Sequence, residues 1–264
     1  MPDPHSLAGR TAIVTGGATL LAHGVVTALS EAGANVVVAD IDAEGGRAAA
    51  GIADSVSFVE TDITDDDAVA ALVAGTAERH GGIDIVVNLA STYLDNGFDS
   101  PRADWLTALN VNVVSTVEVV RHALPHLRRS DSAAVVNFTS TSGKVAQTGR
   151  WLYPASKAAI GQLTRSMAMD LAADGIRVNS VSPGWTWSKI MNDLSGGDRA
   201  KVDSVAGPFH LTGRVADPIE IGRVVAFLAS PAASVVTGAD YAADGGYTAM
   251  GPEQAVPAIP KLTE

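Results

Sequence analysis

The sequence predicts an α/β protein of one domain, in which a doubly wound parallel sheet carries helices on both faces. Short apolar runs that end in a polar residue alternate along the chain with helical patterns. This alternation is typical of a parallel sheet. A glycine-bearing turn, Thr15-Gly16-Gly17, follows the first run, and Asp40 ends the second. An acid about 20 residues beyond such a turn is typical of dinucleotide-binding Rossmann folds.

Seven apolar runs are expected to form the strands, at residues 11–14, 35–40, 56–60, 83–88, 133–139, 176–182 and 239–243. In a parallel sheet, ligands bind beyond the carboxyl ends of the strands. The residues expected at those ends include the following polar, glycine and proline positions: Gly16, Asp40, Asn88, Ser140, Pro183 and Gly184. One edge of the sheet is therefore expected to carry the functional residues.

The remaining segments are expected to cover the sheet. Residues 101–128 read as one long helix that Pro125 bends or ends, and residues 218–230 as a later helix. Residues 186–213 have weak periodicity and are expected to form a substrate lid, and residues 251–264 an irregular tail. No linker or repeat divides the chain, so we expect residues 1–264 to form a single domain.

Composition restricts the partners and the chemistry. The 264 residues include 47% hydrophobic and 18% charged residues and carry a net charge of −11. Because nucleic acids and anionic membranes attract positive surfaces, neither is expected as a partner. The chain has no cysteine, which excludes disulfides and thiolate zinc sites. His122 and His126 have no third ligand nearby, so no metal is expected. Without a signal peptide or a long apolar run, a soluble cytoplasmic protein is expected.

A candidate proton-transfer site lies between residues 140 and 157. Ser140 ends an apolar run, and Tyr153 and Lys157 are four residues apart, which places them on one face of a helix. A nearby ammonium favours the phenolate and lowers the pKa of a tyrosine. Together with a serine hydroxyl, such a pair can move a proton on or off an alcohol oxygen. The Tyr-x-x-x-Lys spacing alone also occurs on ordinary solvated helices.

A candidate nucleotide site lies at the other end of this edge. The helix after Gly16 offers free N–H groups to a pyrophosphate. Asp40 can accept from both ribose hydroxyls of NAD and would repel the 2′-phosphate of NADP, and neither Gly17 nor Ile41 supplies a cation. NAD is therefore the expected cofactor, although Asp40 could instead cap the following helix. Asp62 is expected either to accept from the adenine amino group or to cap the next helix.

With these motifs in place, residues 8–248 resemble a short-chain dehydrogenase/reductase. The matching segments are Asn88-Leu-Ala-Ser91, Asn112, the Ser140, Tyr153 and Lys157 set, Asn179-Ser-Val-Ser-Pro183-Gly184 and Asp244-Gly245-Gly246. The resemblance implies that Tyr153 is the general acid/base, that Ser140 orients the substrate oxygen and that Lys157 lowers the pKa of the tyrosine and binds the nicotinamide ribose. It also implies that Asn112 holds a water through its backbone at a helix irregularity.

The resemblance further implies two sets of contacts. Residues expected to bind NAD are Gly16, Thr19, Leu20, Leu21, Asp40, Ile41, Asp62, Ile63, Asn88, Ala90, Tyr153, Lys157, Pro183, Gly184, Thr186 and Ser188. Residues expected to line the substrate pocket are Ser91, Ser142, Gln147, Trp151, Trp185, Trp187 and Met191. Each tryptophan could equally serve core or interface packing.

The chain departs from the family pattern in its glycine motif. Leu20 and Ala22 stand where the second and third glycines belong. The alanine adds one methyl group at a helix–strand contact, whereas Leu20 adds a side chain where backbone approaches the pyrophosphate. Ser91 replaces a glycine beside the nicotinamide. We still expect NAD to bind.

The expected activity is an NAD-dependent oxidoreductase that interconverts a secondary alcohol, diol or cyclic alcohol and its ketone. Two alternatives remain: a catalytically silent NAD-binding sensor or scaffold, which Leu20 would suit, and a 3-oxoacyl reductase. The resemblance also implies a homotetramer with residues 101–128 and 151–173 at its interfaces. The tail after Gly251 is expected to reach a neighbouring subunit.

Overall fold

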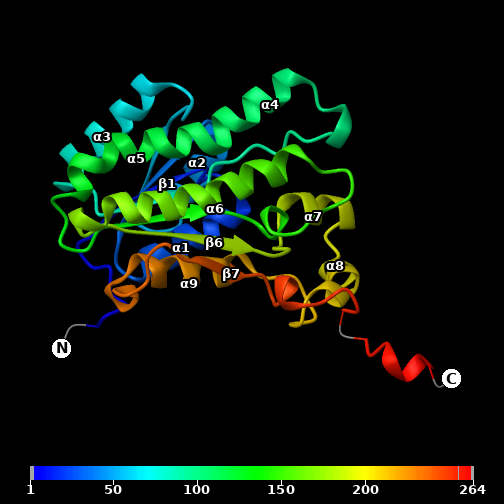
Figure 1. The fold of residues 1–264 in the computed structure, drawn as a ribbon. Helices are drawn as coiled ribbons and strands as arrows, with labels where there is room; N and C mark the ends of the chain where they lie inside the picture. Colours follow the sequence, from blue (N-terminus) through cyan, green and yellow to red (C-terminus); the bar gives the residue numbers. More distant parts are fainter. Residues whose placement is uncertain (1–2, 255, 263–264) are drawn as a thin grey trace.

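A seven-stranded parallel sheet forms the centre of the molecule (Figure 1). The computed structural model describes residues 3–254 and 256–262. The strand order is β3-β2-β1-β4-β5-β6-β7. The strands are β1 (Thr11–Thr15), β2 (Asn35–Asp40), β3 (Val56–Glu60), β4 (Ile85–Asn88), β5 (Ala134–Phe138), β6 (Arg177–Pro183) and β7 (Asp240–Ala243). The order reverses between β1 and β4, and the predicted Rossmann architecture is confirmed.

Helices cover both faces of the sheet (Figure 1). Helices α1, α2 and α9 pack on one face, and α3, α5 and α6 on the other. The helices are α1 (Leu20–Glu31), α2 (Ala43–Ala50), α3 (Asp66–His80), α4 (Arg102–Leu109), α5 (Ser115–Leu127), α6 (Leu152–Leu171), α7 (Lys189–Ser195), α8 (Arg199–Ala206) and α9 (Pro218–Ala229). No helix among the described residues is both long and apolar enough to cross a membrane.

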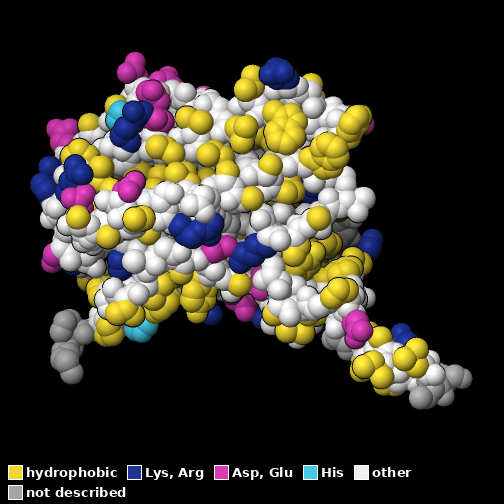
Figure 2. Space-filling view, viewed as in Figure 1, with side chains coloured by type: hydrophobic (Ala, Val, Ile, Leu, Met, Phe, Trp, Pro, Cys, Tyr) yellow, Lys and Arg dark blue, Asp and Glu magenta, His cyan; other side chains and the backbone are white. Residues whose placement is uncertain are grey.

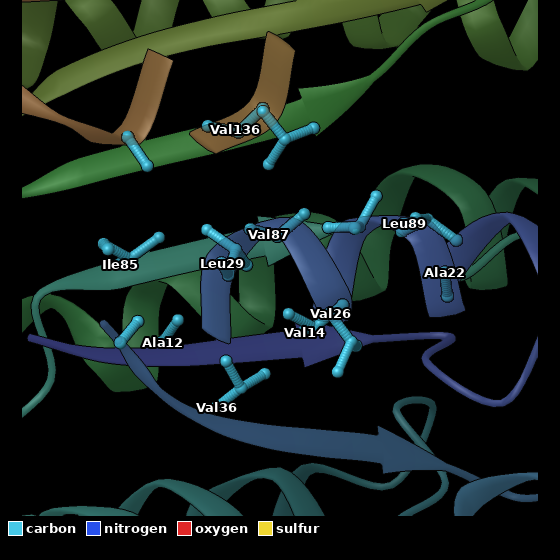
Figure 3. Packing of buried hydrophobic residues seen from close by; sticks show 14 of the residues in the cluster. Ala12, Val14, Ala22, Val26, Leu29, Val36, Ile85, Val87, Leu89 and Val136 are labelled. Atoms are coloured by element: carbon cyan, nitrogen blue, oxygen red, sulfur yellow. The ribbon is translucent and has the colours of Figure 1, made fainter. Parts of the chain in front are cut away.

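The alternation of side chains along each strand divides the core into two layers. Val14 and Val36 point toward α1, where they join Leu29 in one buried cluster (Figure 3). Ile13 and Val37 point to the opposite face and pack with the side chains of α3 and α5. Each fully buried aliphatic side chain of this kind stabilises the fold by about 1.5–3 kcal/mol. Because both faces are covered, the strands read as nearly continuous apolar runs.

Helices α1 and α9 approach each other at two glycines. A Cβ atom on Gly24 would lie 2.2 Å from the carbonyl carbon of Pro218. A Cβ atom on Gly222 would lie 2.1 Å from the carbonyl oxygen of Gly24. Neither distance is compatible with a side chain, so the two helices contact through backbone. Helix α1, which begins at the glycine turn, is thus fixed against α9, which follows the expected lid.

The long helix expected at residues 101–128 is interrupted. It consists of α4, a π-helical turn η2 (Asn110–Val114) and α5. Pro125 lies inside α5, which ends two residues later at Leu127. The π-helical turn places one extra residue in the ladder, a feature frequent at functional sites. Sequence periodicity cannot show such a single-residue insertion, because the residues on both sides remain helical.

Candidate active site

The turns after β1 and β4 touch at the carboxyl edge of the sheet. The Thr15 hydroxyl accepts from the backbone N–H groups of Leu89 (3.3 Å) and Ala90 (3.4 Å). Gly16 has φ +67°, and a Cβ atom there would lie 2.5 Å from the Cα of Ala90. Only glycine fits this close backbone approach. At the reversal in strand order, where the sequence predicts the nucleotide, the two turns are therefore held together backbone against backbone.

Helix α1 starts directly beyond this turn. Thr19 caps it, because its hydroxyl accepts from the backbone N–H of Ala22 at 3.2 Å. Ala22 is completely buried, which explains why only a small side chain replaces the family glycine there. Leu20 is the first helical residue and is 38% exposed. The N–H groups of the first turn lack partners within a helix, so this end can hold an anion despite Leu20.

Asp40 is tied to the glycine turn and does not cap α2. Its carboxylate accepts from the backbone N–H of Ala18 and from that of Asp42, both at 2.9 Å. The cap of α2 is Asp42, which accepts from Glu44 and Gly45. The alternative role of Asp40 as a helix cap is therefore wrong, and its carboxylate remains half-exposed beside the turn.

Asp62 is also not a helix cap. It accepts from the backbone N–H (2.9 Å) and the hydroxyl (2.7 Å) of Thr64. These two hydrogen bonds lower the pKa of the Asp62 carboxyl. Asp65 caps α3 instead. Of the two roles that the sequence allowed, the structure removes the cap, and contact with adenine remains a prediction.

Asn88 belongs to a buried polar chain that crosses the sheet. Its Nδ2 donates to Oδ1 of Asn137 at 2.9 Å, and Nδ2 of Asn137 donates to the hydroxyl of Thr164 at 3.0 Å. This chain ties β4 to β5 and to α6. The Oδ1 atom of Asn88 is buried without a protein partner. Asn88 thus has a clear structural role, and only Oδ1 is left for a ligand.

The structure brings Ser140, Tyr153 and Lys157 together at this edge. Ser140 follows β5, and the turn after it lies against α6, since a Cβ atom on Gly143 would be 2.9 Å from the Lys157 carbonyl carbon. Tyr153 is the second residue of α6 and Lys157 is one turn further. Tyr153 and Lys157 are 6% and 4% exposed. Both side chains are therefore buried, whereas the Tyr-x-x-x-Lys spacing alone would also fit a solvated helix face.

Burial controls the proton affinity of Tyr153. Loss of solvent raises the pKa of Tyr153 well above its usual value, and the neighbouring Tyr93 raises it further. A hydrogen bond with Ser140 and the charge of Arg150 oppose this rise. The expected lowering of this pKa by Lys157 is not found. Without a further positive group, Tyr153 therefore holds its proton at neutral pH and is poised as an acid.

Lys157 is also strongly affected by burial. Desolvation lowers the pKa of Lys157 to about 8. Its ammonium donates to the carbonyl oxygen of Phe138 at 3.0 Å and lies 5.5 Å from the centre of the Tyr153 ring. With this pKa Lys157 remains mostly protonated at neutral pH, so the raised pKa of Tyr153 is caused by burial and not by loss of the lysine charge.

Asn112 lies in the π-helical turn and is buried. Its Oδ1 accepts from the Thr92 backbone N–H (2.8 Å) and the Ser91 hydroxyl (3.2 Å). Its Nδ2 donates to the Thr92 carbonyl (3.2 Å) and the Ser156 hydroxyl (3.0 Å). Every polar atom of the side chain is thus used to hold the segment after β4 against α6. The backbone role expected for Asn112 remains a prediction.

Sequence reasoning missed two residues of the segment after β4. The ring of Tyr93 stacks on that of Tyr153 with 4.7 Å between centroids. The carboxylate of Asp95 accepts from the backbone N–H groups of Trp151 (3.0 Å) and Tyr153 (2.9 Å). Asp95-Asn96-Gly97 reads as a turn, but no spacing in the chain relates it to a helix that starts more than 50 residues later.

The expected pocket residues fall into two groups. Ser142 donates to Oε1 of Gln147 at 2.7 Å, close to Ser140, and Trp151 is 53% exposed in edge contact with Phe98. Ser91 donates to Asn112, and the three remaining residues, Trp185, Trp187 and Met191, pack in a small separate cluster with Val202, Ala206 and Val215. The sequence allowed either pocket lining or packing for the two tryptophans of this cluster, and the structure shows packing.

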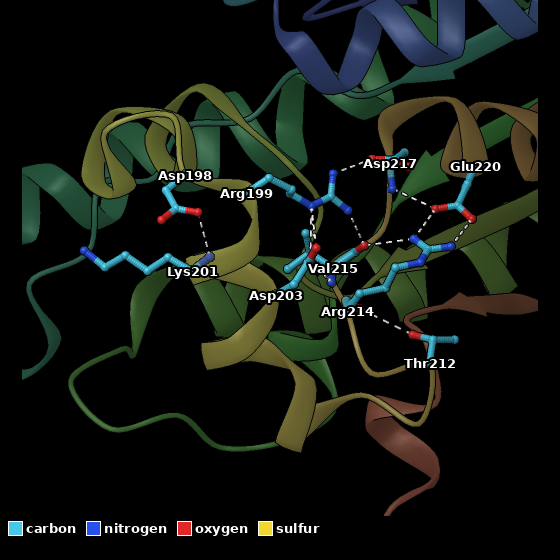
Figure 4. Close-up of polar contacts among 9 residues, drawn as sticks. All are labelled: Asp198, Arg199, Lys201, Asp203, Thr212, Arg214, Val215, Asp217 and Glu220. Carbon is cyan, nitrogen blue, oxygen red and sulfur yellow. Dashed lines mark hydrogen bonds and ion pairs between the residues drawn. The ribbon is translucent and has the colours of Figure 1, made fainter.

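Residues 186–213 contain two short helices, α7 and α8, that the weak periodicity did not indicate. Ser188 caps α7 by accepting from the Met191 N–H, so its hydroxyl already has a structural use. Arg199 bonds to Asp203 and Asp217, which joins α8 to the start of α9 (Figure 4). Movement of this segment as a lid remains a prediction.

Comparisons with known proteins show which sequences and structures this chain resembles. A family model described as Enoyl-(Acyl carrier protein) reductase matches residues 17–248. A cis-4-hydroxycyclohexanecarboxylate dehydrogenase of Sinomonas cyclohexanicum is 37% identical and covers 93% of this chain and 99% of its own length. An L-fucose dehydrogenase of Oryctolagus cuniculus is 34% identical, with 90% and 85% covered. The crystal structure of gox2181 superimposes with a TM-score of 0.85 at 31% identity and covers 94% of this chain and 98% of its own.

Proposed function

We propose that this chain, which belongs to the short-chain dehydrogenase/reductase family, interconverts a cyclic secondary alcohol and its ketone with NAD(H). Family membership makes it a nicotinamide-dependent oxidoreductase that acts on CH–OH groups. One observation carries the proposal: Tyr153 and Lys157 are buried together beside Ser140 at the carboxyl edge of the sheet. Burial of two ionisable groups without an opposite charge is costly, and such arrangements mark functional sites.

In this proposal Tyr153 transfers the proton. In the reducing direction its protonated hydroxyl donates to the forming alkoxide, which suits the raised pKa. In oxidation the phenolate must form, and the positive charge of an oxidised cofactor would favour it. The Ser140 hydroxyl holds the substrate oxygen beside Tyr153. Lys157 holds the cofactor ribose and shields the phenolate.

The residues at the turn fit a nicotinamide dinucleotide. The first turn of α1 leaves backbone N–H groups for a pyrophosphate. Asp40 offers a carboxylate for two ribose hydroxyls, and a 2′-phosphate there would meet a negative charge, which is why we propose NAD. The bound cofactor supplies hydride transfer at its nicotinamide ring. The chain supplies position, charge and the proton.

A ring-shaped substrate is supported by the relatives and by the aromatic surroundings. The names of two relatives denote hydroxyl compounds with a ring, a hydroxycyclohexanecarboxylate and L-fucose. The exposed ring of Tyr93 stacks on that of Tyr153, and the exposed ring of Trp151, two residues earlier in the chain, contacts Phe98. Flat aromatic faces offer apolar contact to a saturated ring.

The test is an activity panel that follows NADH absorbance with cyclohexanols, hydroxycyclohexanecarboxylates and sugars. We expect turnover with at least one ring alcohol and a higher kcat/KM with NAD than with NADP. The Tyr153→Phe variant should lose nearly all turnover and still bind NAD in a calorimetric titration. Wild-type turnover in that variant would contradict the proton-transfer role. Binding of NAD without turnover on any alcohol would instead favour the sensor or scaffold.

We also propose a homotetramer. The outer side of α4–α6 carries exposed apolar side chains, among them Leu106, Val114 and Met169 (Figure 2). The tail leaves the body of the molecule (Figure 1) with Val256, Ile259 and Leu262 exposed. Exposed apolar groups of this size favour burial against a neighbouring subunit. Light scattering that gives the mass of a monomer would contradict this assembly.

A further inference from the structure

The carboxylate of Asp95 caps a helix that belongs to a distant part of the chain. It accepts from the backbone N–H groups of Gly97 (3.0 Å), Trp151 (3.0 Å) and Tyr153 (2.9 Å). No side chain of α6 itself caps this end, and the residue at the cap position is Trp151. Asp95 therefore satisfies N–H groups that the start of a helix leaves without partners. Its negative charge also lies at the positive end of the helix.

Four further contacts join the segment of Asp95 to the catalytic edge. Asn112 fixes the beginning of this segment through Thr92. Tyr93 stacks on Tyr153, with an angle of 20° between the rings. Phe98 meets Trp151 edge to face, with 5.6 Å between centroids. At Gly97, a Cβ atom would lie 3.0 Å from the carbonyl oxygen of Gly149. Residues 91–98 thus form a strap, fixed at the π-helical turn and at the start of α6.

Tyr153 depends directly on this strap. It is the second residue of α6, so its position changes whenever the first turn frays. Lys157 is one turn further along and is held separately, because its ammonium donates to Phe138. Loss of the cap should therefore displace the tyrosine and leave the lysine in place. A displacement of about 1 Å at a reacting group can cost about 100-fold in rate.

We propose that Asp95 is a positioning residue for the reaction, because its carboxylate fixes Tyr153 and the stacked Tyr93 ring in one geometry. This inference rests on the proposed function of Tyr153 as the acid/base. Asp95 does not touch the reacting atoms. It acts through the backbone of α6, and the length of its side chain is the decisive property.

Three variants test the proposal in the full-length enzyme. Asp95→Ala removes the cap, and we expect kcat to fall roughly tenfold or more while the KM for NAD is unchanged. Asp95→Asn keeps the side-chain length but replaces one of the two accepting oxygens with an NH2 group, so its kcat should lie between those of wild type and Asp95→Ala. Asp95→Glu keeps the charge but adds a methylene, and should lose roughly tenfold in kcat.

A matched control separates positioning from stability. Asp84 lies before β4, at the opposite edge of the sheet, and its carboxylate likewise joins distant segments by accepting from the Thr11 N–H (2.9 Å) and the Ser130 hydroxyl (2.6 Å). Asp84→Ala should lower the free energy of unfolding and leave kcat unchanged. Amide hydrogen exchange of residues 151–153 should rise in Asp95→Ala and not in Asp84→Ala.

The outcomes are distinct. Wild-type kcat in Asp95→Glu, or equal kcat in Asp95→Ala and Asp84→Ala, would overturn the positioning role of Asp95. If Asp95→Ala does not fold, the comparison of the Asn and Glu variants decides, since each retains an acceptor at the helix end. Turnover in Tyr153→Phe would overturn the proposed function instead, and this result does not depend on any Asp95 variant.

Discussion

The ring of Tyr93 lies almost parallel to that of Tyr153, with 4.7 Å between centroids and 20° between planes. One ring is 58% exposed and the other is buried, so Tyr93 forms the solvent side of the proton-transfer group. This contact joins the turn after β4 to the first turn of α6. It also affects acidity, because Tyr93 contributes to the raised pKa of Tyr153, after burial.

The first prediction concerns the pH dependence of oxidation. Tyr93→Phe keeps the ring and removes the hydroxyl, so the pKa of Tyr153 should fall. Because oxidation needs the phenolate, the rise of kcat with pH should move to lower pH. A kcat–pH profile for alcohol oxidation measures this shift.

Tyr241→Phe is the matched control, since Tyr241 is half-exposed on β7 and contacts Phe227. Its profile should coincide with that of wild type. An unchanged profile in Tyr93→Phe, or a shift to higher pH, would show that the Tyr93 hydroxyl does not act on Tyr153.

The second prediction concerns the choice of nucleotide. Asp40→Ala removes the expected acceptor of the ribose hydroxyls, and hydrogen bonds to charged groups contribute about 1.5–3 kcal/mol. The Kd for NAD should therefore rise about tenfold or more. The ratio of kcat/KM with NADP to that with NAD should also rise, because a negative charge is lost.

Asp42→Ala controls for charge, since it removes the same charge two residues away and only uncaps α2. It should keep the preference for NAD. Titration calorimetry and kinetics with both nucleotides provide the values. Equal changes in the two variants would assign the preference to net charge rather than to Asp40.

The third prediction concerns acid stability. Arg214 bonds to Glu220 through two 2.8 Å contacts and lowers the pKa of Glu220 to about 2. A lowered pKa stabilises the fold above the usual value near 4.5, and this contribution is lost as pH falls toward 2. Because both side chains are more than a third exposed, solvent screening limits the effect to about 1 kcal/mol.

Glu220→Gln should therefore unfold at lower urea concentration at pH 7, and the difference from wild type should shrink as the pH is lowered through 4. Urea unfolding at several pH values measures this trend. A difference that stays constant across the range would mean that the ionised carboxylate is not the cause.

The fourth prediction concerns the contact between α1 and α9. Gly24→Ala places a methyl group into the backbone of Pro218, and overpacking of this kind costs about 1–3 kcal/mol. Gly75→Ala is the control, because a Cβ atom there meets nothing within 4 Å and Gly75 lies in α3. An alanine at such a helical site should stabilise by about 0.5–1 kcal/mol. Urea unfolding of both variants should therefore give changes of opposite sign.

The order of the strands along the chain and the use of the carboxyl edge could be predicted from apolar runs and their polar ends. Ser140, Tyr153 and Lys157 are local in sequence, so their spacing was informative. Tyr93 and Asp95 contact the start of α6, more than 50 positions away. These contacts form only when the pairing of β4 with β5 brings the two segments together, so no local pattern could predict them.

Local sequence patterns also could not assign a role where one residue type serves two purposes. Asp40 and Asp62 read as possible caps, and only the backbone distances assign the caps to Asp42 and Asp65 instead. Trp185 and Trp187 read equally well as pocket or packing residues. Their cluster with Val202 could be seen only once α8 had formed.

The paired glycines of α1 and α9 limit how this protein can be recombined with its relatives. Gly24 and Gly222 accept each other only as backbone against backbone, although almost 200 residues separate them in sequence. A chimera that takes its first half from one relative and its second from another must keep glycine at both positions. A second half with a larger residue at position 222 would push a side chain into the backbone of α1 at Gly24.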